Sequence, residues 1–225
     1  MIGSPTGSFG ARHLDVGTRM GELLFGLIMT LTFTLGAGFV IEEEGREGAR
    51  EMLIAILGCN LAWGIIDGVL YVLGQVFERG RIRRIAALVR SAASPAEARQ
   101  HVAAEWDEVL RPVTDEPVRH EVYTAVVERL RQETAAPNRV QRKDVMGGLA
   151  SGWIVFACSF PAALPFLLLD DPRFALRISN GILLALLFAA GYYAARHTLA
   201  RPWLSGATFL LAGAFLVVLA IALGG

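Results

Sequence analysis

The sequence predicts an all-α integral membrane protein with five transmembrane helices and a cytoplasmic three-helix insertion between the second and the third. Composition is the first observation behind this prediction: 54% of the 225 residues are hydrophobic, and the mean hydropathy is +0.47. These values are high for a soluble domain, and they exclude disordered, collagenous and disulfide-rich secreted proteins. The other two observations are that the apolar residues form long blocks instead of alternating, and that a charged segment separates two of these blocks.

Five apolar blocks supply the ~20 residues that a helix needs to cross a ~30 Å hydrocarbon core. Helix is expected because a backbone in lipid must satisfy its own hydrogen bonds. The predicted spans are Met20–Ile41, Met52–Phe77, Met146–Leu169, Leu176–Ala195 and Trp203–Gly224. Residues 1–19 are rich in glycine and are expected to form a flexible cytoplasmic N-terminus. They do not resemble a signal peptide, because the first apolar run begins late and is too long.

Positive charge near the ends of the spans predicts the orientation. With the N-terminus inside, eleven basic residues flank the inner ends: Arg12, Arg19, Arg79, Arg81, Arg83, Arg84, Arg139, Arg142, Lys143, Arg196 and Arg201. Four lie in the outer loops: Arg46, Arg50, Arg173 and Arg177. This difference predicts that the N-terminus is inside and the C-terminus outside. The first outer loop is also acidic, with Glu42, Glu43, Glu44, Glu47 and Glu51.

Residues 78–145 are then a cytoplasmic helical domain, and residues 146–225 carry the last three spans. Three helices are predicted in residues 78–145. The first, Glu78–Ala92, carries Ile82, Ile85, Leu88 and Val89 on one side, and the second is capped by Ser94 and ends before Pro112. The third begins near Pro117, ends before Pro137 and presents Val118, Val122, Val126 and Leu130. A domain this small is marginal alone, so we expect it to pack on a partner copy.

Asp67 lies well inside the second span, where a charge costs about 2.5–3.5 kcal/mol. Helical spacing places it on one stripe with Asn60, Trp63, Tyr71 and Gly74. This stripe is typical of an ion or proton path. The alternative is that Asp67 is protonated or hydrogen-bonded and ties helices together.

Glu22 and Met29 lie on a second stripe, in the first span, with Gly26, Phe33 and Ala37. A carboxylate and a thioether suit a divalent transition metal, and sulfur discriminates against hard ions. In the alternative, Glu22 favours the helix N-terminus and Met29 is core or lipid-facing. The hydroxyls of Thr30, Thr32 and Thr34 are expected to bond within their own helix. Cys59 and Cys158 are expected to be small buried side chains, with a soft metal ligand as the alternative.

Pro161 and Pro165 fall within the third span. Each removes a backbone donor and disrupts the preceding turn, which predicts a kinked helix. In lipid such a break is tolerated against protein or a wet cavity, so a passage beside it is one interpretation.

Acidic and imidazole side chains cluster on the predicted cytoplasmic helices. Glu97, His101, Glu105 and Glu108 share one face of the second helix, opposite Val102, Trp106 and Val109, and Glu116, His120, Glu121 and Glu128 lie on the third. Oxygen and imidazole ligands of this kind suit Fe²⁺ or Mn²⁺. The alternative is an ordinary solvated helix face.

Several function classes lose support. The formal charge of zero provides no field that attracts nucleic acid. The phosphate-binding motif GxxxxGK[ST] is missing, as are HExxH and GxSxG, so neither ATP-driven pumping by this chain nor an enzyme activity is expected.

The third span, Phe156-Ala-Cys-Ser-Phe-Pro-Ala-Ala-Leu-Pro-Phe166, resembles the proline-bearing third span of the vacuolar iron transporter family (VIT1/CCC1-like). Ser179–Tyr193, Gly191 and the glycine-ended last span resemble that family's last two helices. The five-span layout with an insertion is similar over nearly the whole chain, and the motifs over residues 146–225. The first two spans depart from the family. An Asp-Gly pair is replaced by Phe25-Gly-Leu-Ile-Met-Thr30, and Asp67 stands near the position of a glutamate.

The resemblance implies a homodimer that exports Fe²⁺ or Mn²⁺ from the cytoplasm in exchange for protons. Carried over by position, Glu97, Glu105 and Glu108 would collect metal, with His101 as an added ligand. No permanently bound cofactor is implied, because the metal is substrate and the proton is counter-ion. The alternative is a non-transporting membrane protein whose cytoplasmic domain binds or senses metal or docks a partner. Twenty of the 21 basic residues are arginine, which favours a GC-rich bacterium and its cytoplasmic membrane.

Overall fold

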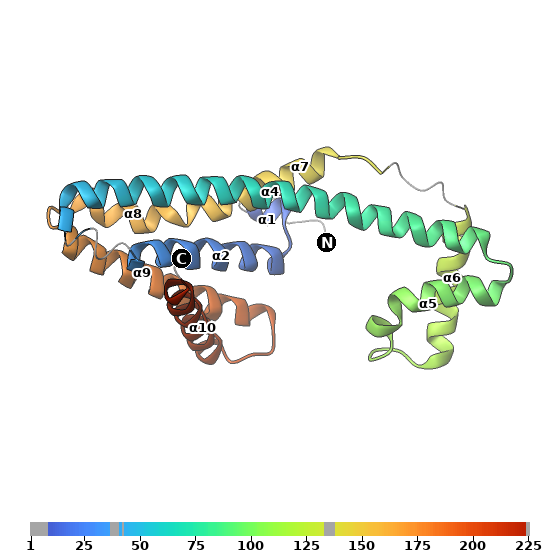
Figure 1. The fold of residues 1–225 in the computed structure, drawn as a ribbon. Coiled ribbons are helices and arrows are strands. Elements are labelled where there is room, and N and C mark those ends of the chain that lie inside the picture. Colours follow the sequence, from blue (N-terminus) through green and yellow to red (C-terminus); the bar gives the residue numbers. More distant parts are fainter. Residues whose placement is uncertain (1–8, 37–40, 42, 133–137, 224–225) are drawn as a thin grey trace. The chain divides into compact units, whose positions relative to one another are not determined.

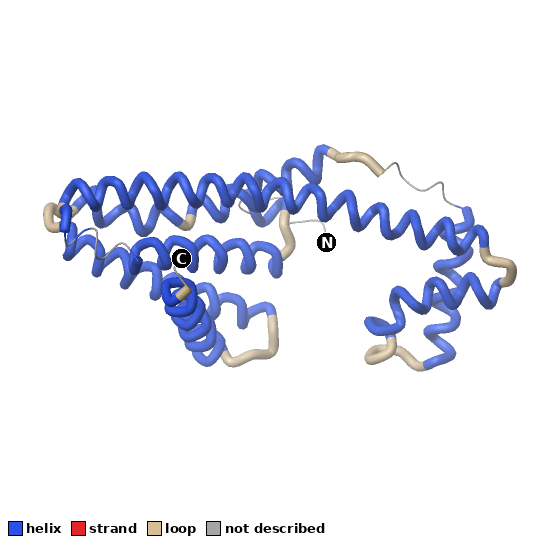
Figure 2. The backbone as a smooth tube through the Cα atoms, in the orientation of Figure 1, coloured by secondary structure: helices blue, strands red, loops and turns tan. Residues whose placement is uncertain are grey.

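The computed structural model describes residues 9–36, 41, 43–132 and 138–223. Within these ranges every regular element is a helix, as Figure 2 shows. The all-α fold class is therefore confirmed. Figure 1 labels the α-helices, which are α1 (Phe9–His13), α2 (Val16–Gly36), α4 (Arg46–Ser91), α5 (Pro95–Leu110), α6 (Glu116–Gln132), α7 (Arg142–Ala157), α8 (Ser159–Leu168), α9 (Pro172–Ala194) and α10 (Pro202–Ala222). A short 3₁₀ helix, η1 (Ala195–His197), follows α9.

The chain divides into two compact units. We call the first, Met1–Val72 with Arg142–Gly225, the membrane unit, and the second, Leu73–Gln141, the insert. Five helical segments among the described residues are long and apolar enough to cross a membrane: Val16–Gly36, Arg46–Ser91, Arg142–Leu168, Pro172–His197 and Pro202–Leu219. Each overlaps one of the five spans predicted from the sequence.

The N-terminal segment differs from its prediction. Residues 1–8, including Gly3, Pro5 and Gly7, lie outside the described residues. Where a flexible segment was expected, Phe9–His13 form the short helix α1, and α2 begins at Val16. Asp15 explains this early start, because its carboxylate accepts hydrogen bonds from the Thr18 backbone N–H at 3.0 Å and from the Thr18 hydroxyl at 2.5 Å. The hydroxyl bond, followed by the backbone bond, lowers the pKa of Asp15 below its ordinary value.

The core of the membrane unit brings together four elements far apart in sequence. Leu27 and Leu31 of α2 pack with Ala162 of α8, Leu183 and Leu187 of α9, and Val217 of α10. All of these side chains have at most 1% of their surface exposed. In the acidic segment after α2, Glu42 lies outside the described residues, and Glu43, Glu47 and Glu51 are exposed.

Helix α4 is one continuous helix of 46 residues. At 1.5 Å per residue it is about 70 Å long, more than twice the hydrocarbon thickness, so only part of it can lie in lipid. The sequence predicts a separate insert helix over Glu78–Ala92, and this is wrong. No proline or helix-terminating glycine interrupts Phe77–Arg90, so the second span simply continues.

The other two insert helices match their predictions at the ends that the structure describes. Ser94 caps α5 by accepting a hydrogen bond from the Glu97 backbone N–H at 3.1 Å, and Pro95 occupies the first turn. Helix α5 ends at Leu110, and α6 covers Glu116–Gln132. The predicted limit at Pro137 lies outside the described residues.

The insert has its own hydrophobic core, formed by Ile85, Val89, Ala98, Val102, Tyr123 and Val127. Some residues that were expected on this face are exposed instead: 69% of Val109, 46% of Val118 and 44% of Ile82 are accessible. Val109 and Val118 lie within one turn of an end of α5 and of α6, whereas Ile82 lies inside α4. Trp106 and Val126 pack against the core as expected.

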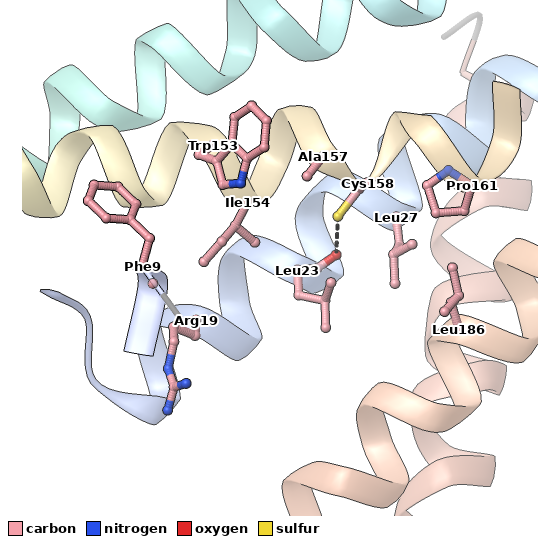
Figure 3. Close-up of a pocket in the computed structure, with 11 residues that line it drawn as sticks. Phe9, Arg19, Leu23, Leu27, Trp153, Ile154, Ala157, Cys158, Pro161 and Leu186 are labelled. Atoms are coloured by element: carbon pink, nitrogen blue, oxygen red, sulfur yellow. Dashed lines mark hydrogen bonds between the residues drawn. The ribbon is translucent and has the colours of Figure 1, made fainter. Parts of the chain in front are cut away.

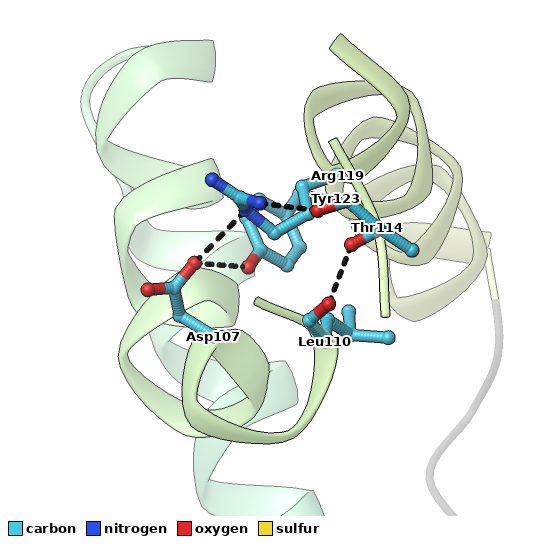
Figure 4. Close-up of polar contacts among 5 residues, drawn as sticks. All are labelled: Asp107, Leu110, Thr114, Arg119 and Tyr123. Carbon is cyan, nitrogen blue, oxygen red and sulfur yellow. Dashed lines mark hydrogen bonds and ion pairs between the residues drawn. The ribbon is translucent and has the colours of Figure 1, made fainter. Parts of the chain in front are cut away.

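A polar network joins α5 to α6 (Figure 4). Asp107 accepts a hydrogen bond from the Tyr123 hydroxyl at 2.8 Å and pairs with the Arg119 guanidinium at 3.3 Å. Arg119 also donates to the Thr114 carbonyl at 2.6 Å, and the Thr114 hydroxyl donates to the Leu110 carbonyl at 2.6 Å. Burial, and then the bond to Asp107, raises the pKa of Tyr123 above its ordinary value. The network fixes the α5–α6 turn.

Candidate functional site

Helices α4 and α7 touch through their main chains, and glycine makes this contact possible. A Cβ atom added to Gly64 would lie 2.6 Å from the Gly152 carbonyl oxygen, and one added to Gly68 would lie 2.7 Å from that of Gly148. Both pairs have the GxxxG spacing that allows membrane helices to approach closely. The contact therefore sets how closely α4 and α7 lie at this level of the membrane unit.

Three polar side chains meet next to this contact. Glu22 of α2 accepts a hydrogen bond from the Ser151 hydroxyl of α7 at 2.7 Å. The carboxyl groups of Glu22 and Asp67 lie close enough for their charges to interact. Both residues are half-buried, and the Oδ2 atom of Asp67 has no hydrogen-bond partner.

A second polar group lies two helical turns further along the same helices. Asn60 is fully buried, and its Nδ2 atom donates to the Thr30 hydroxyl at 2.8 Å and to the Val155 carbonyl at 3.4 Å. The Thr30 hydroxyl in turn donates to the Gly26 carbonyl at 2.8 Å, and Thr32 and Thr34 also bond within α2, as predicted. The Oδ1 atom of Asn60 has no hydrogen-bond partner.

The remaining members of the two predicted stripes are placed as follows. Met29 is half-buried on α2, seven residues from Glu22. Trp63 packs edge-on against Phe25, with ring centroids 5.7 Å apart, and Tyr71 lies against Gly147. Ala37 lies outside the described residues, and the cysteines Cys59 and Cys158 are both unpaired.

The proline-bearing span is interrupted between α7 and α8, at Cys158. Pro161 has no N–H to donate to the Ala157 carbonyl four residues earlier, which accounts for a break at this point. Pro165 lies inside α8, and both Ser159 and Ala162 are fully buried. The break packs on α2, where the Cys158 thiol donates to the Leu23 carbonyl at 3.6 Å.

The acidic face predicted on α5 is partly committed to other partners. Glu97 accepts a hydrogen bond from the Ala93 backbone N–H at 2.7 Å, and Glu105 forms an ion pair with Arg81 at 2.5 Å. His101 is half-buried, and Glu108 is exposed. On α6, His120 and Glu121 are exposed. No group of three or more His, Cys, Asp or Glu side chains in the described residues is placed to hold a metal ion.

Sequence reasoning identified Glu22, Asp67 and Asn60 but missed Ser151. A signal for it was present: the spacing of Gly64 and Gly68 matches that of Gly148 and Gly152, and Ser151 is adjacent to the second pair. Pairing these motifs would have placed the Ser151 hydroxyl near Asp67.

Two comparisons with known proteins bear on identity. No curated protein matches the chain in sequence. The family model described as the VIT family matches residues 80–225. This range covers most of the insert and the last three spans, and it begins after Glu22, Asn60 and Asp67. Because the match covers well over half of the chain, the protein belongs to the VIT family, a family of membrane metal transporters.

Proposed function

We propose that this protein exports a divalent transition metal ion, Fe²⁺ or Mn²⁺, from the cytoplasm in exchange for protons. The observation that carries the proposal is the Glu22–Asp67 pair, two interacting carboxyl groups between membrane helices, with no cation paired to either in the described part of the chain. Such a pair is costly in lipid unless protons or a metal ion neutralise it.

Exchange follows from competition at these oxygens. With one proton shared, the pair carries a charge of −1. A divalent cation that binds to both carboxylates displaces this proton, and a returning proton releases the metal. The Ser151 hydroxyl, by donating to Glu22 at 2.7 Å, holds that carboxyl group toward Asp67 through either step.

Met29 and Asn60 supply a second level of ligands along the path. Each is seven residues from its carboxylate, about 10 Å at 1.5 Å per residue. Thr30 bonds to Asn60 at 2.8 Å, which places α2 and α4 in register at this level. A thioether sulfur is a ligand that transition metals accept and that hard cations such as Mg²⁺ disfavour, whereas the unpartnered Oδ1 of Asn60 is an oxygen ligand that both classes accept.

The insert is proposed to collect cations near the entrance. Glu108, His120 and Glu121 are exposed, while Glu97 and Glu105 have protein partners that a metal ion would have to displace. A homodimer could bring a second set of these groups, together with His101, to a shared site. We place the N-terminus inside and the C-terminus outside a bacterial cytoplasmic membrane, consistent with the excess of basic residues at the predicted inner ends.

The proposal is tested in proteoliposomes with an imposed pH gradient, with Fe²⁺ or Mn²⁺ influx followed by an enclosed fluorescent chelator. We expect Asp67→Asn to reduce flux by about tenfold or more, because the loss of one ionic contact worth about 1.4 kcal/mol is already a tenfold change. Glu22→Gln should behave alike. Asp170→Asn is the matched control, since Asp170 is exposed and pairs with Arg46 at the other end of the unit.

Flux that is independent of the pH gradient, or unchanged in Asp67→Asn, would contradict the proposal. If the full-length protein instead binds the metal without moving it, and Glu108→Gln weakens that binding while Asp67→Asn does not, the chain is a metal-binding membrane protein and not a transporter.

A further inference from the structure

A cavity of about 350 Å³ opens in the membrane unit between α1, α2, α7, α8 and α9. Figure 3 shows its walls, which include Leu23, Leu27, Ile154, Pro161 and Leu186. Neither Glu22 nor Asp67 lines it, so it is separate from the carboxyl pair. Its volume is in the range of small-molecule sites.

One charged side chain, Arg19, lines this otherwise largely apolar cavity. In Figure 3 it lies at the opposite end from Pro161 and Leu186, and its guanidinium points away from the apolar wall. The Nε atom donates to the Asp15 carbonyl at 3.4 Å, and Arg19 forms no ion pair within the described ranges. An arginine whose stem covers apolar surface and whose charge is left uncompensated suits a phosphate group.

A second cavity, of about 390 Å³, provides a contrast within the same unit. It also has arginines beside apolar side chains, Arg46 and Arg50 with Leu53 and Phe166. Here Arg46 pairs with Asp170 at 2.8 Å and Arg50 with Glu47 at 3.4 Å, so both charges are compensated. The first cavity therefore differs by its uncompensated charge and not by its apolar walls.

We infer that the first cavity binds an anionic phospholipid, with an acyl chain along the apolar wall and the headgroup phosphate on Arg19. Charge complementarity favours this occupant, because basic pockets between membrane helices bind anionic headgroups. The apolar walls favour an acyl chain over water. A zwitterionic lipid gains the same apolar contact but less from the cation. The site is independent of the proposed transport reaction.

Native mass spectrometry of the full-length protein in mild detergent tests this inference, with equal amounts of phosphatidylglycerol and phosphatidylcholine added. We expect bound phosphatidylglycerol to exceed bound phosphatidylcholine by about fivefold, the size of one cation–headgroup contact. Arg19→Gln should remove the preference, and Arg19→Lys should keep most of it. Arg46→Gln is the control and should leave it unchanged.

Equal binding of the two lipids by the wild type, or an unchanged preference in Arg19→Gln, would overturn the inference. So would a lipid-free dimer that dissociates in Arg19→Gln, because the cavity would then be an interface between two copies of the chain. If Arg19→Gln fails to fold, Arg19→Lys still discriminates: a lost preference in a folded Arg19→Lys protein would contradict a charge-based site.

Discussion

Two carboxyl groups in each unit have opposite kinds of partner. In the insert, Glu105 pairs with Arg81, and Asp107 pairs with Arg119 and accepts from Tyr123. In the membrane unit, Glu22 and Asp67 face each other, Ser151 is the hydroxyl donor to Glu22, and one oxygen of Asp67 has no partner. The insert thus pairs these acids with its own cations. Pairing is less necessary there than in a membrane, because water would solvate an unpaired carboxylate at little cost.

Under the proposed function, the difference separates structural carboxylates from those that bind protons or metal. An acid matched by an arginine on the neighbouring helix stabilises the fold and leaves no room for a further cation. Two acids placed together in a membrane, with only a hydroxyl beside them, destabilise the fold unless a proton or a metal ion joins them. The following predictions test this distinction, starting with the largest expected effect.

The largest effect is expected from filling the α4–α7 contact. In Gly64→Leu the new Cβ would meet the Gly152 carbonyl oxygen at 2.6 Å, and backbone cannot move aside as a flexible side chain can. Overpacking costs about 1–3 kcal/mol, and here it would also push α4, which carries Asp67, away from α7. We expect poor recovery of folded protein and no flux, measured by size-exclusion chromatography and the proteoliposome assay.

Gly58→Leu is the matched control, because nothing lies within 4 Å of a Cβ at Gly58 on the same helix. Equal damage from both substitutions would show that α4 is sensitive to side-chain volume in general, and that the contact with α7 does not position the carboxyl pair.

A smaller effect is expected from Ser151→Ala. The substitution removes the 2.7 Å hydrogen bond to Glu22 but keeps both carboxyl groups. A hydrogen bond contributes about 1 kcal/mol, so we expect flux to fall about fivefold in a protein that remains folded. Thr208→Val is the control, since the Thr208 hydroxyl donates only to the Leu204 carbonyl of its own helix. If Ser151→Ala instead fails to fold, Ser151 has a structural role, and the contrast between the carboxyl groups of the two units would be contradicted at this position.

The smallest effect is expected in the insert, at alkaline pH. Burial and the Asp107 bond raise the pKa of Tyr123, so the neutral phenol is favoured in the folded state. A raised folded-state pKa means that stability is fully present below the ordinary value of 10.0 and is lost as the pH rises through the folded value.

Chemical denaturation of the full-length protein, followed by circular dichroism across this pH range, measures the effect. Tyr123→Phe should be slightly less stable at neutral pH but should lose less stability at alkaline pH, with metal flux unchanged. Tyr193→Phe serves as the control, since 44% of that tyrosine is exposed. If wild type and Tyr123→Phe lose stability equally at alkaline pH, groups other than Tyr123 cause the effect.

The sequence predicted the fold well because its strongest signals, hydropathy and charge, extend over long segments of the chain. Five apolar blocks and one charged segment determine the helices, and local chemistry fixed the Ser94 cap. It failed where a boundary has no local marker: nothing between Phe77 and Glu78 ends a helix, so α4 continues to Ser91. The exposure of Val109 also depends on where α6 ends its contact with α5, which periodicity does not encode.

The candidate site divides in the same way. Asp67 was recognisable because a charge is rare within an apolar block, but the Glu22–Asp67 pair depends on which faces of α2 and α4 meet. The metal-binding face of the insert was predicted from residue spacing within each helix alone. Arg81 comes from α4 and occupies Glu105, a contact that a single-helix pattern cannot reveal.

The backbone contact between α4 and α7 limits how any ion can reach Asp67. A main chain that lies against another main chain, as at Gly64 with Gly152 and Gly68 with Gly148, leaves no gap for even a dehydrated cation. An ion therefore cannot reach the carboxyl pair by passing between α4 and α7 at this contact. In the proposed transport reaction, an ion that binds to Asp67 would therefore approach the carboxyl pair from a side other than the α4–α7 contact.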